Sequence, residues 1–304
     1  MNVATNPFHA QPLLEPGTYV VAVSGGVDSM VLLDMLVPVP GLKLTVAHFD
    51  HGIREDSHLD RLLVQEAAKR YGLPFVYEQG HLGAGASEDV ARQARYEFLG
   101  RVRSAAGADA IVTAHHQDDQ LETAYINILR GTNRRGLTSL RSTQGRRRPL
   151  LHLSKKELLA YAHANNIVWR EDSTNQDTTY LRNRVRHTML SLLPARERAK
   201  LAKELEELAV INQSIDKALT NQLHMQSSVN ALDRRWFIML PHEVAREVMA
   251  TWLRQKGIAS LDKKRLELIT NSAKTLKPGK RIDVDSTHIL LIQKDKLALK
   301  TSER

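Results

Sequence analysis

A short glycine-containing segment near the N-terminus has the composition of a loop that binds phosphate. Residues 24–29 read Ser-Gly-Gly-Val-Asp-Ser, after an apolar run at residues 20–23 and before a second one from Val31. Glycine lets backbone N–H groups approach an anion closely, and a helix that begins there adds the positive end of its dipole. Loops of the G-x-x-x-x-G-K-[ST] type also carry a lysine for the β- and γ-phosphates, and this segment has none. We therefore predict a loop that holds the β/γ unit of a nucleotide as departing pyrophosphate; the alternative is a structural Gly-Gly turn.

A second polar segment places two histidines and three carboxylates close together. It contains His115, His116, Asp118, Asp119 and Glu122. Asp119 and Glu122 are spaced so that they share one face of a helix, where they could hold an ammonium group. The alternative is that these carboxylates stabilise the N-terminus of the helix. Adjacent histidines project in different directions, so we expect no dedicated zinc site here.

A third polar group follows the next apolar run, at His48, Asp50 and His51. These side chains end a strand beside the glycine segment. They could therefore reach the adenosine part of a bound nucleotide, or the Mg²⁺ bound to the phosphates of that nucleotide. The alternative is that the histidines hydrogen-bond a turn.

Arginine is concentrated in one stretch of the chain. From Arg130 to Arg148 there are seven arginines and no Asp or Glu, and the whole chain has a formal net charge of +9 and a pI near 9.7. Because the stretch has no acid to neutralise it, we predict that nucleic-acid phosphate does so; a solvated basic loop is the alternative. Segments 87–99 and 175–186 carry further arginines. The arginines predicted to contact RNA are Arg92, Arg95, Arg130, Arg146, Arg147, Arg148, Arg182 and Arg184.

The elements that must position these side chains alternate between strand and helix. Buried-strand patterns occupy residues 20–23, 44–49, 75–78 and 110–113, with helical patterns at 29–36 and 59–71 and in a segment that Ser87 can cap. This alternation predicts an α/β fold, a parallel twisted sheet with crossover helices. Ligands of such sheets bind at the carboxyl ends of the strands, where the polar segments fall.

Beyond about residue 113 the pattern becomes mainly helical. Ser154 and Glu157 form a capping-box signature for a helix toward Asn165. Further helical patterns occupy residues 196–221, 241–255 and 261–271, and strand-like runs follow at 281–285 and 288–293. We predict one domain at residues 1–195 and a smaller α+β C-terminal domain at residues 196–304.

The composition excludes several classes of chemistry. The chain has no cysteine, which excludes disulfides, thiolate zinc sites, iron–sulfur clusters and persulfide chemistry. Its apolar runs are short, and its N-terminus lacks the pattern of a secretory signal, so we expect a cytoplasmic protein with no membrane partner. The oligomeric state is left open, a homodimer included.

Four ordered blocks give a resemblance to a known family. Besides the glycine segment they are HFDHGIREDS (48–57), TAHHQDDQLETAYINILRG (113–131) and REDSTNQDTTYLRNRVR (170–186). Together they resemble the tRNA(Ile)-lysidine synthetases, N-type ATP pyrophosphatases of the PP-loop superfamily with an adenine nucleotide alpha-hydrolase-like fold. The resemblance covers roughly residues 20–190, and the chain resembles the shorter members that lack an additional C-terminal domain.

The resemblance implies a reaction and its cofactors. In this family ATP, with Mg²⁺, adenylates the C2 oxygen of cytidine 34 in the CAU anticodon of tRNA(Ile), and free L-lysine then displaces AMP through its ε-amine. The resulting lysidine reads A instead of G, so decoding changes from AUG to AUA and tRNA identity from Met to Ile.

The same resemblance implies roles for individual residues. The ATP-binding set is Ser24, Gly25, Gly26, Val27, Asp28, Ser29 and His51. Asp119 and Glu122 are the lysine-binding pair, and Asp28, Asp119 and Glu122 are the catalytic residues, with Asp28 also a candidate ligand for the Mg²⁺ that accompanies ATP.

Three alternatives belong to other functional classes. A tRNA thiolase of the same superfamily usually needs cysteine chemistry that this chain lacks. An amidotransferase-type synthetase acting on a small molecule would not need the arginine-rich stretch. An RNA-binding module with a degenerate nucleotide loop is disfavoured because residues 24–29 are intact.

Overall fold

The computed structural model describes residues 13–52, 56–80, 88–171, 181–228, 230–258 and 261–302. The chain divides into two compact units, residues 1–205 and residues 206–304. This division falls within a continuous helix, α8 (Ala195–Gln226), and therefore later than the boundary at residue 195 that the sequence predicts.

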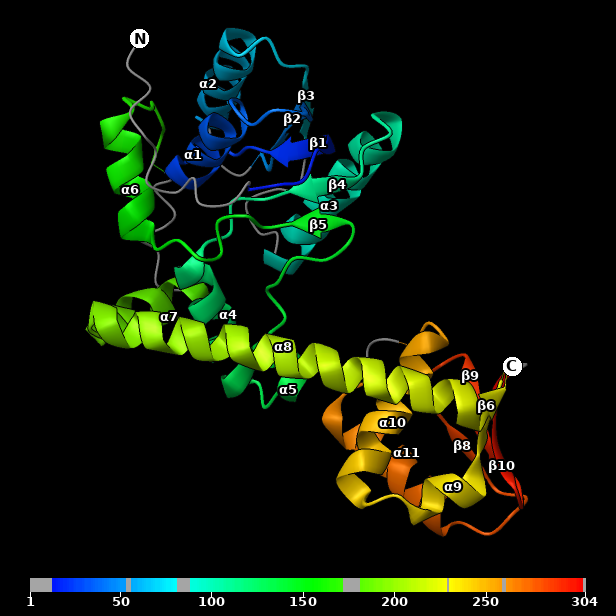
Figure 1. The fold of residues 1–304 in the computed structure, drawn as a ribbon. Coiled ribbons are helices and arrows are strands. Elements are labelled where there is room, and N and C mark those ends of the chain that lie inside the picture. The colour runs from blue at the N-terminus through cyan, green and yellow to red at the C-terminus, as the bar shows by residue number, and fades with distance from the viewer. Residues whose placement is uncertain are drawn as a thin grey trace. The chain divides into compact units, whose positions relative to one another are not determined.

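A parallel sheet forms the centre of the first unit (Figure 1). Its strands are β1 (Gly17–Ala22), β2 (Leu42–Asp50), β3 (Phe75–Gln79), β4 (Ala110–Val112) and β5 (Arg146–Arg147), in the spatial order β3-β2-β1-β4-β5. Every neighbouring pair is parallel, with Val21 opposite Val46 on one side and Val112 on the other. The α/β fold class predicted from the sequence is confirmed.

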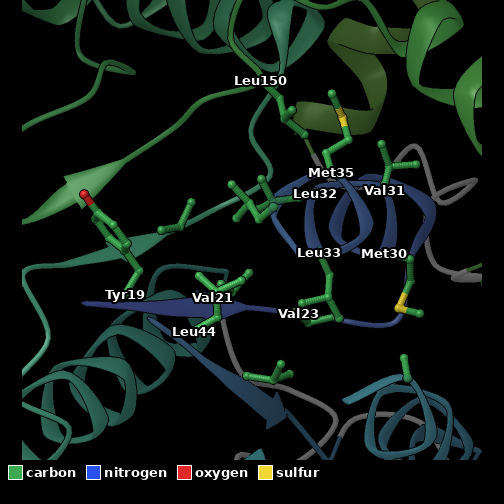
Figure 2. Packing of buried hydrophobic residues seen from close by; sticks show 14 of the residues in the cluster. Tyr19, Val21, Val23, Met30, Val31, Leu32, Leu33, Met35, Leu44 and Leu150 are labelled. Atoms are coloured by element: carbon green, nitrogen blue, oxygen red, sulfur yellow. The ribbon is translucent and has the colours of Figure 1, made fainter. Parts of the chain in front are cut away.

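Helices cover both faces of this sheet, as crossover connections require. On one face α1 (Val27–Leu36) and α2 (Ser57–Arg70) pack against β1 and β2, and α6 (Lys155–Ala164) joins the same apolar cluster. Figure 2 shows Leu33 of α1 pointing toward the segment that carries Val21 and Val23. On the opposite face α3 (Glu88–Ala105) packs Phe98 and Leu99 against Val20.

The strand order reverses direction between β1 and β4. The chain passes from β1 outward through β2 to β3, and then returns by way of α3 to place β4 on the other side of β1. The loops that leave two such strands diverge, and the gap between them is where ligands of open α/β sheets bind. Residues 23–26 after β1 and residues 113–116 after β4 flank this point.

A small helical layer follows the sheet in the first unit. It comprises α4 (Gln117–Leu129), α5 (Arg134–Leu137), α7 (Leu181–Thr188), the 3-10 turn Leu190–Leu192 and the start of α8. Leu121 and Ile126 of α4 pack with Val185 of α7 and with Ala202 of α8. This packing fixes the face of α4 that carries the carboxylates.

The second unit combines the end of α8 with helices on an antiparallel sheet. The helices are α9 (Arg234–Met239), α10 (His242–Gln255) and α11 (Lys263–Thr275). The strands β6 (Ser227–Ser228), β7 (Ala231–Asp233), β8 (Arg281–Asp283), β9 (His288–Ile292) and β10 (Lys296–Thr301) pair in the order β6-β7-β10-β9-β8. The predicted α+β character of the tail is confirmed.

Candidate functional site

The glycine segment forms a tight turn between β1 and α1. Gly25 has a φ of +92°, a left-handed conformation that favours glycine, and a Cβ there would come within 3.2 Å of the Asp60 side chain. The backbone N–H of Ser24 donates to the Ser29 hydroxyl, which in turn donates to the Gly26 carbonyl oxygen. The N-cap residue of α1 is Gly26, which has no side chain to cap the first turn. The backbone amides of this turn are therefore oriented for an anion.

Asp28, in the first turn of α1, lies between two basic side chains. Lys155 Nζ lies 2.7 and 2.9 Å from its two carboxylate oxygens, and His116 Nε2 lies 3.7 Å from one of them. Burial alone would raise the pKa of Asp28, but His116 and Lys155 outweigh burial and lower it. Asp28 therefore favours its anionic form in the first turn of α1, beside the glycine segment.

The two adjacent histidines after β4 have opposite protonation tendencies. Burial lowers the pKa of His115 to about 3. Asp119 acts to raise this pKa, and nearby arginines act to lower it further. Burial would also lower the pKa of His116, but its contacts with Asp28 and Asp119 raise it. His115 thus stays neutral near pH 7, whereas His116 favours its charged form beside two carboxylates.

The carboxylates of α4 have separate tasks. Asp118 accepts a hydrogen bond from the backbone N–H of Lys155 at 2.8 Å and lies 3.3 Å from the Arg198 guanidinium. Asp119 accepts from the backbone N–H of His116, which caps the helix. Asp119 therefore caps α4, as the helix-stabilising alternative expects.

Asp119 and Glu122 lie on the same face of α4 and share one partner, Arg186 of α7. Arg186 donates two hydrogen bonds to Glu122, at 2.6 and 3.0 Å, and its Nη2 lies 3.7 Å from Asp119. Glu122 is fully buried, and burial raises its pKa despite the attraction of Arg186. The pair of carboxylates is thus a site that already holds a planar cation.

The polar group after β2 is mostly engaged in local structure. His48 is buried and donates through Nδ1 to the Val23 carbonyl oxygen, and burial lowers the pKa of His48. Asp50 accepts from the Gly52 backbone N–H and the Ser57 hydroxyl. The His51 ring packs edge-on against Phe49 at 5.0 Å. These contacts of His48 and Asp50 are therefore with neighbouring backbone and side-chain groups.

Three of the predicted RNA-contacting arginines surround one aromatic ring. Their guanidinium carbons lie 4.1, 5.2 and 5.5 Å from the ring centroid of Tyr96, for Arg146, Arg92 and Arg95 respectively. Burial would raise the pKa of the Tyr96 hydroxyl, but the surrounding arginines outweigh it and lower the pKa. The side chains of α3 and β5 thus form a basic cluster around Tyr96, which we call the Tyr96 cluster.

Arg148 also contacts Tyr96, whereas the remaining predicted arginines lie apart from this cluster. Arg148 is 6% exposed and its guanidinium donates to the Arg141 carbonyl oxygen, so it faces inward. Arg147 donates to the Thr143 carbonyl oxygen. Arg130, at the end of α4, and Arg184, on α7, are exposed, and Arg182 is half-buried. The structure brings together part of the predicted set and leaves the rest apart.

Comparison with known proteins identifies the family. Residues 4–193 match the family described as the PP-loop domain, which is more than half of the chain. The chain belongs to the PP-loop domain family. We refer below to the glycine segment at residues 24–29 as the PP-loop.

Curated relatives share one name. The chain is 40% identical over 192 residues to the tRNA(Ile)-lysidine synthase of Solibacter usitatus, covering 62% of this chain and 44% of that protein. It is 45% identical over 191 residues to the same enzyme of Thermus thermophilus, covering 59% and 37%. With that of Lactiplantibacillus plantarum it is 32% identical over 289 residues, covering 89% and 64%. The chain therefore spans less than two thirds of the length of these relatives.

A solved structure supports the fold alone. The U34-tRNA thiolase NcsA from Methanococcus maripaludis, with its [4Fe-4S] cluster, is similar with a TM-score of 0.54 and 19% sequence identity, over 64% of this chain and 73% of that one. At this identity, the similarity extends to architecture and not to chemistry.

Three residues make contacts here that were not predicted from the sequence, although Arg186 was expected to have a general RNA role. Lys155 and Arg186 contact the PP-loop aspartate and the α4 carboxylates, and Arg170 ties the PP-loop to α2 through the Gly25 carbonyl oxygen and Asp60. Lys155 follows the capping-box serine, a signal that indicates only a helix N-terminus. Arg186 stands in an alternating arginine run, where the sequence does not distinguish one arginine from the next.

Some residues of the predicted blocks, namely residues 53–55, Ser87 and residues 172–180, lie outside the described residues. Within the part of the chain that is described, no group of three or more His, Asp or Glu side chains is arranged to hold a metal ion. Nor does this part contain a helix that is both long and apolar enough to cross a membrane.

Proposed function

We propose that the chain is an ATP-dependent ligase that joins lysine to C2 of cytidine 34 in the CAU anticodon of tRNA(Ile), releasing AMP and pyrophosphate. The product, lysidine, would change decoding from AUG to AUA and tRNA identity from Met to Ile. The observation that carries the proposal is the juxtaposition, at the reversal point of the sheet, of a PP-loop with the acidic face of α4. The shared name of the curated relatives points to the same activity.

The first step activates a poor leaving oxygen. The C2 oxygen of cytidine would attack the α-phosphorus of ATP, and the bond to the bridging oxygen of pyrophosphate would break. The PP-loop turn at Gly25 and the uncapped start of α1 suit the β- and γ-phosphates. Asp28 offers the hard carboxylate oxygen that Mg²⁺ prefers, so the residues present fit an ATP-bound Mg²⁺, which would supply charge neutralisation on the phosphates.

The second step needs a neutral amine. A lysine side chain with a pKa near 10.4 has roughly one neutral amine in a thousand at pH 7. We propose that Asp119 and Glu122 receive its ammonium group on the face where Arg186 now lies. Burial raises the pKa of Glu122, which makes this carboxylate a better proton acceptor. Glu122 would therefore both orient and deprotonate the nucleophile.

RNA binding would rest on exposed and half-buried basic side chains. The Tyr96 cluster, together with Arg130 and Arg184, offers guanidinium groups that can contact backbone phosphates. A base in an anticodon loop costs less to extrude than one in a duplex. The assignment of catalysis to residues 1–195 and of tRNA binding to residues 196–304 is part of this proposal. Cytoplasmic location and homodimerisation remain predictions from the sequence.

One incubation tests the proposal. The protein is mixed with ATP, Mg²⁺, labelled lysine and total tRNA, and label is sought in the isoleucine isoacceptor with the CAU anticodon. We expect AMP release to require both tRNA and lysine. AMP formation without tRNA, or label in no tRNA, would overturn the assignment.

A further inference from the structure

The PP-loop lacks a lysine, yet an ammonium group lies at its mouth. Lys155 is 127 residues beyond Asp28 in sequence, and its Nζ contacts both oxygens of the Asp28 carboxylate. The Lys155 side chain is 41% exposed, so the pair faces the solvent-accessible side of the loop. A cation is therefore present where the loop's own sequence provides none.

The backbone of Lys155 is fixed by the start of α6. Its N–H donates to Asp118 of α4, and Ser154 and Glu157 close a capping box around it. The Nζ end of the side chain has four methylenes of reach and moves without the backbone. The ammonium group can thus shift locally while its origin stays in place.

A second contact aligns α6 with α1. Tyr161 donates to Asp34 at 2.8 Å, and Tyr71 of α2 donates to the other oxygen of the same carboxylate at 2.7 Å. Tyr161 lies six residues after Lys155, and Asp34 lies six residues after Asp28. The two helices therefore run side by side in the same direction, joined at two levels, which holds Lys155 over the PP-loop.

The contact between Asp28 and Lys155 can be replaced by contacts of each side chain with a bound nucleotide. An uncompensated carboxylate beside the first turn of α1 would repel the phosphates that the loop is shaped to accept. In the free protein, Lys155 compensates that carboxylate. With Mg²⁺–ATP bound, Asp28 would hold the metal cation, and the ammonium group of Lys155 would be free to contact a phosphate.

We propose that Lys155 is a further catalytic residue, which leaves Asp28 and binds the β-phosphate of ATP. This inference rests on the proposed function. As the C2 oxygen bonds to the α-phosphorus, the electron pair of the broken bond stays on the bridging oxygen of the leaving pyrophosphate. Lys155 stabilises that developing charge, the task that a lysine inside the loop performs in other nucleotide-binding loops.

The test compares Lys155→Met with Lys156→Met, its exposed neighbour on the same helix. Calorimetry measures binding of Mg²⁺–ATP, of pyrophosphate and of AMP, and a single-turnover assay follows pyrophosphate release in the presence of tRNA. For Lys155→Met we expect the Kd for ATP and pyrophosphate to rise about ten- to a hundredfold, the loss of one charge-assisted contact, with the Kd for AMP unchanged within about twofold. Lys156→Met should match the wild type, and Lys155→Arg should recover part of the pyrophosphate affinity. Equal losses for ATP and AMP would show that Lys155 merely keeps the loop in shape and would overturn the inference.

A second measurement uses the wild-type protein, so it tests the inference even if the Lys155→Met variant fails to fold. Acetylation of lysines by acetic anhydride, read by mass spectrometry, should slow at Lys155 when pyrophosphate is added and stay constant at Lys156. An unchanged rate at Lys155 would overturn the inference. The two proposals also fail separately. If the wild type binds pyrophosphate through Lys155 but never labels tRNA with lysine, the proposed function fails alone. If the wild type labels tRNA and Lys155→Met releases pyrophosphate at the wild-type rate, the Lys155 role fails alone.

Discussion

Exchanging Glu122 and Arg186 for glutamine, singly and together, tests the energetic importance of the pair at the α4 face. Glu122 is fully buried and receives two hydrogen bonds, whereas the Arg186 side chain is 36% exposed. Charge-assisted hydrogen bonds contribute about 1.5–3 kcal/mol each, and water at the exposed guanidinium reduces that value. We expect a coupling energy of about 2 kcal/mol.

A surface pair supplies the control. Arg101 Nη2 lies 2.7 Å from both carboxylate oxygens of Glu78, and the two side chains are 60% and 42% exposed. Exposed pairs usually contribute about 0–1 kcal/mol. If the coupling energy of the Glu122–Arg186 cycle exceeds that of this control, the difference measures the effect of burial on the pair.

Native-state hydrogen exchange provides the readout, because it reports the local opening free energy of the elements that each pair joins, α4 and α7 for Glu122–Arg186 and β3 and α3 for Glu78–Arg101. Single variants should open more easily than the wild type, and the double variant should cost less than the sum of the single ones. If the coupling energy is no larger than that of the Glu78–Arg101 cycle, the assignment of Glu122 as a buried charge that needs Arg186 is wrong.

The same Glu122→Gln variant separates the two half-reactions. It removes the charge with little change of shape, so the lysine requirement should rise about ten- to a hundredfold while ATP still adenylates the tRNA. A lysine titration of the adenylated intermediate in single-turnover experiments measures this. Equal loss of both half-reactions would move Glu122 to the nucleotide site or to a purely structural role.

Three further predictions follow from the site. Asp28→Ala should abolish AMP and pyrophosphate formation and leave tRNA affinity nearly intact; near-normal pyrophosphate release would refute its assignment. Replacing Arg92, Arg95 and Arg146 by alanine should weaken tRNA binding and reduce the log–log salt slope by about 2, at about 0.7 per lost single-strand contact, whereas an unchanged slope would make the Tyr96 cluster a solvated surface. His115 has a depressed pKa of about 3 in the folded protein, so its neutral form contributes stability that is present above its unfolded value near pH 6.5 and is lost as the pH falls toward 3. His115→Asn should flatten urea-measured stability against pH in that window by up to about 1.4 kcal/mol per pH unit, and an unaltered pH profile would contradict the assigned burial.

The sheet could be predicted from the sequence because its signals are local. The strands β1 to β4 are short apolar runs separated by helical periodicity, and parallel order follows from that alternation. The strand β5 was missed, since two arginines carry no strand signal and pair only because β4 offers a free edge. The last strand, β10, was missed as well: its pattern mixes lysine with apolar residues on an antiparallel sheet.

The positions of candidate side chains could be predicted from the sequence only for residues that are close together both in sequence and in space. Asp119 and Glu122 share a face through helical spacing alone. The arrival of Lys155 at Asp28 depends on how α6 packs against α1, which no local pattern encodes. Arg148 differs from the other arginines of its stretch for the same reason: tertiary packing turns its side chain inward.

The Glu122–Arg186 pair also constrains the order in which the polypeptide can mature during synthesis. Its two members are 64 residues apart, and α4 leaves the ribosome well before α7 does. Until Arg186 emerges, burying Glu122 would leave a carboxylate without its cation, which is strongly unfavourable. The nascent chain should therefore keep α4 loosely packed and complete this layer only when α7 is available. Fragments that stop short of Arg186 should behave as incomplete domains that attract chaperones and proteases.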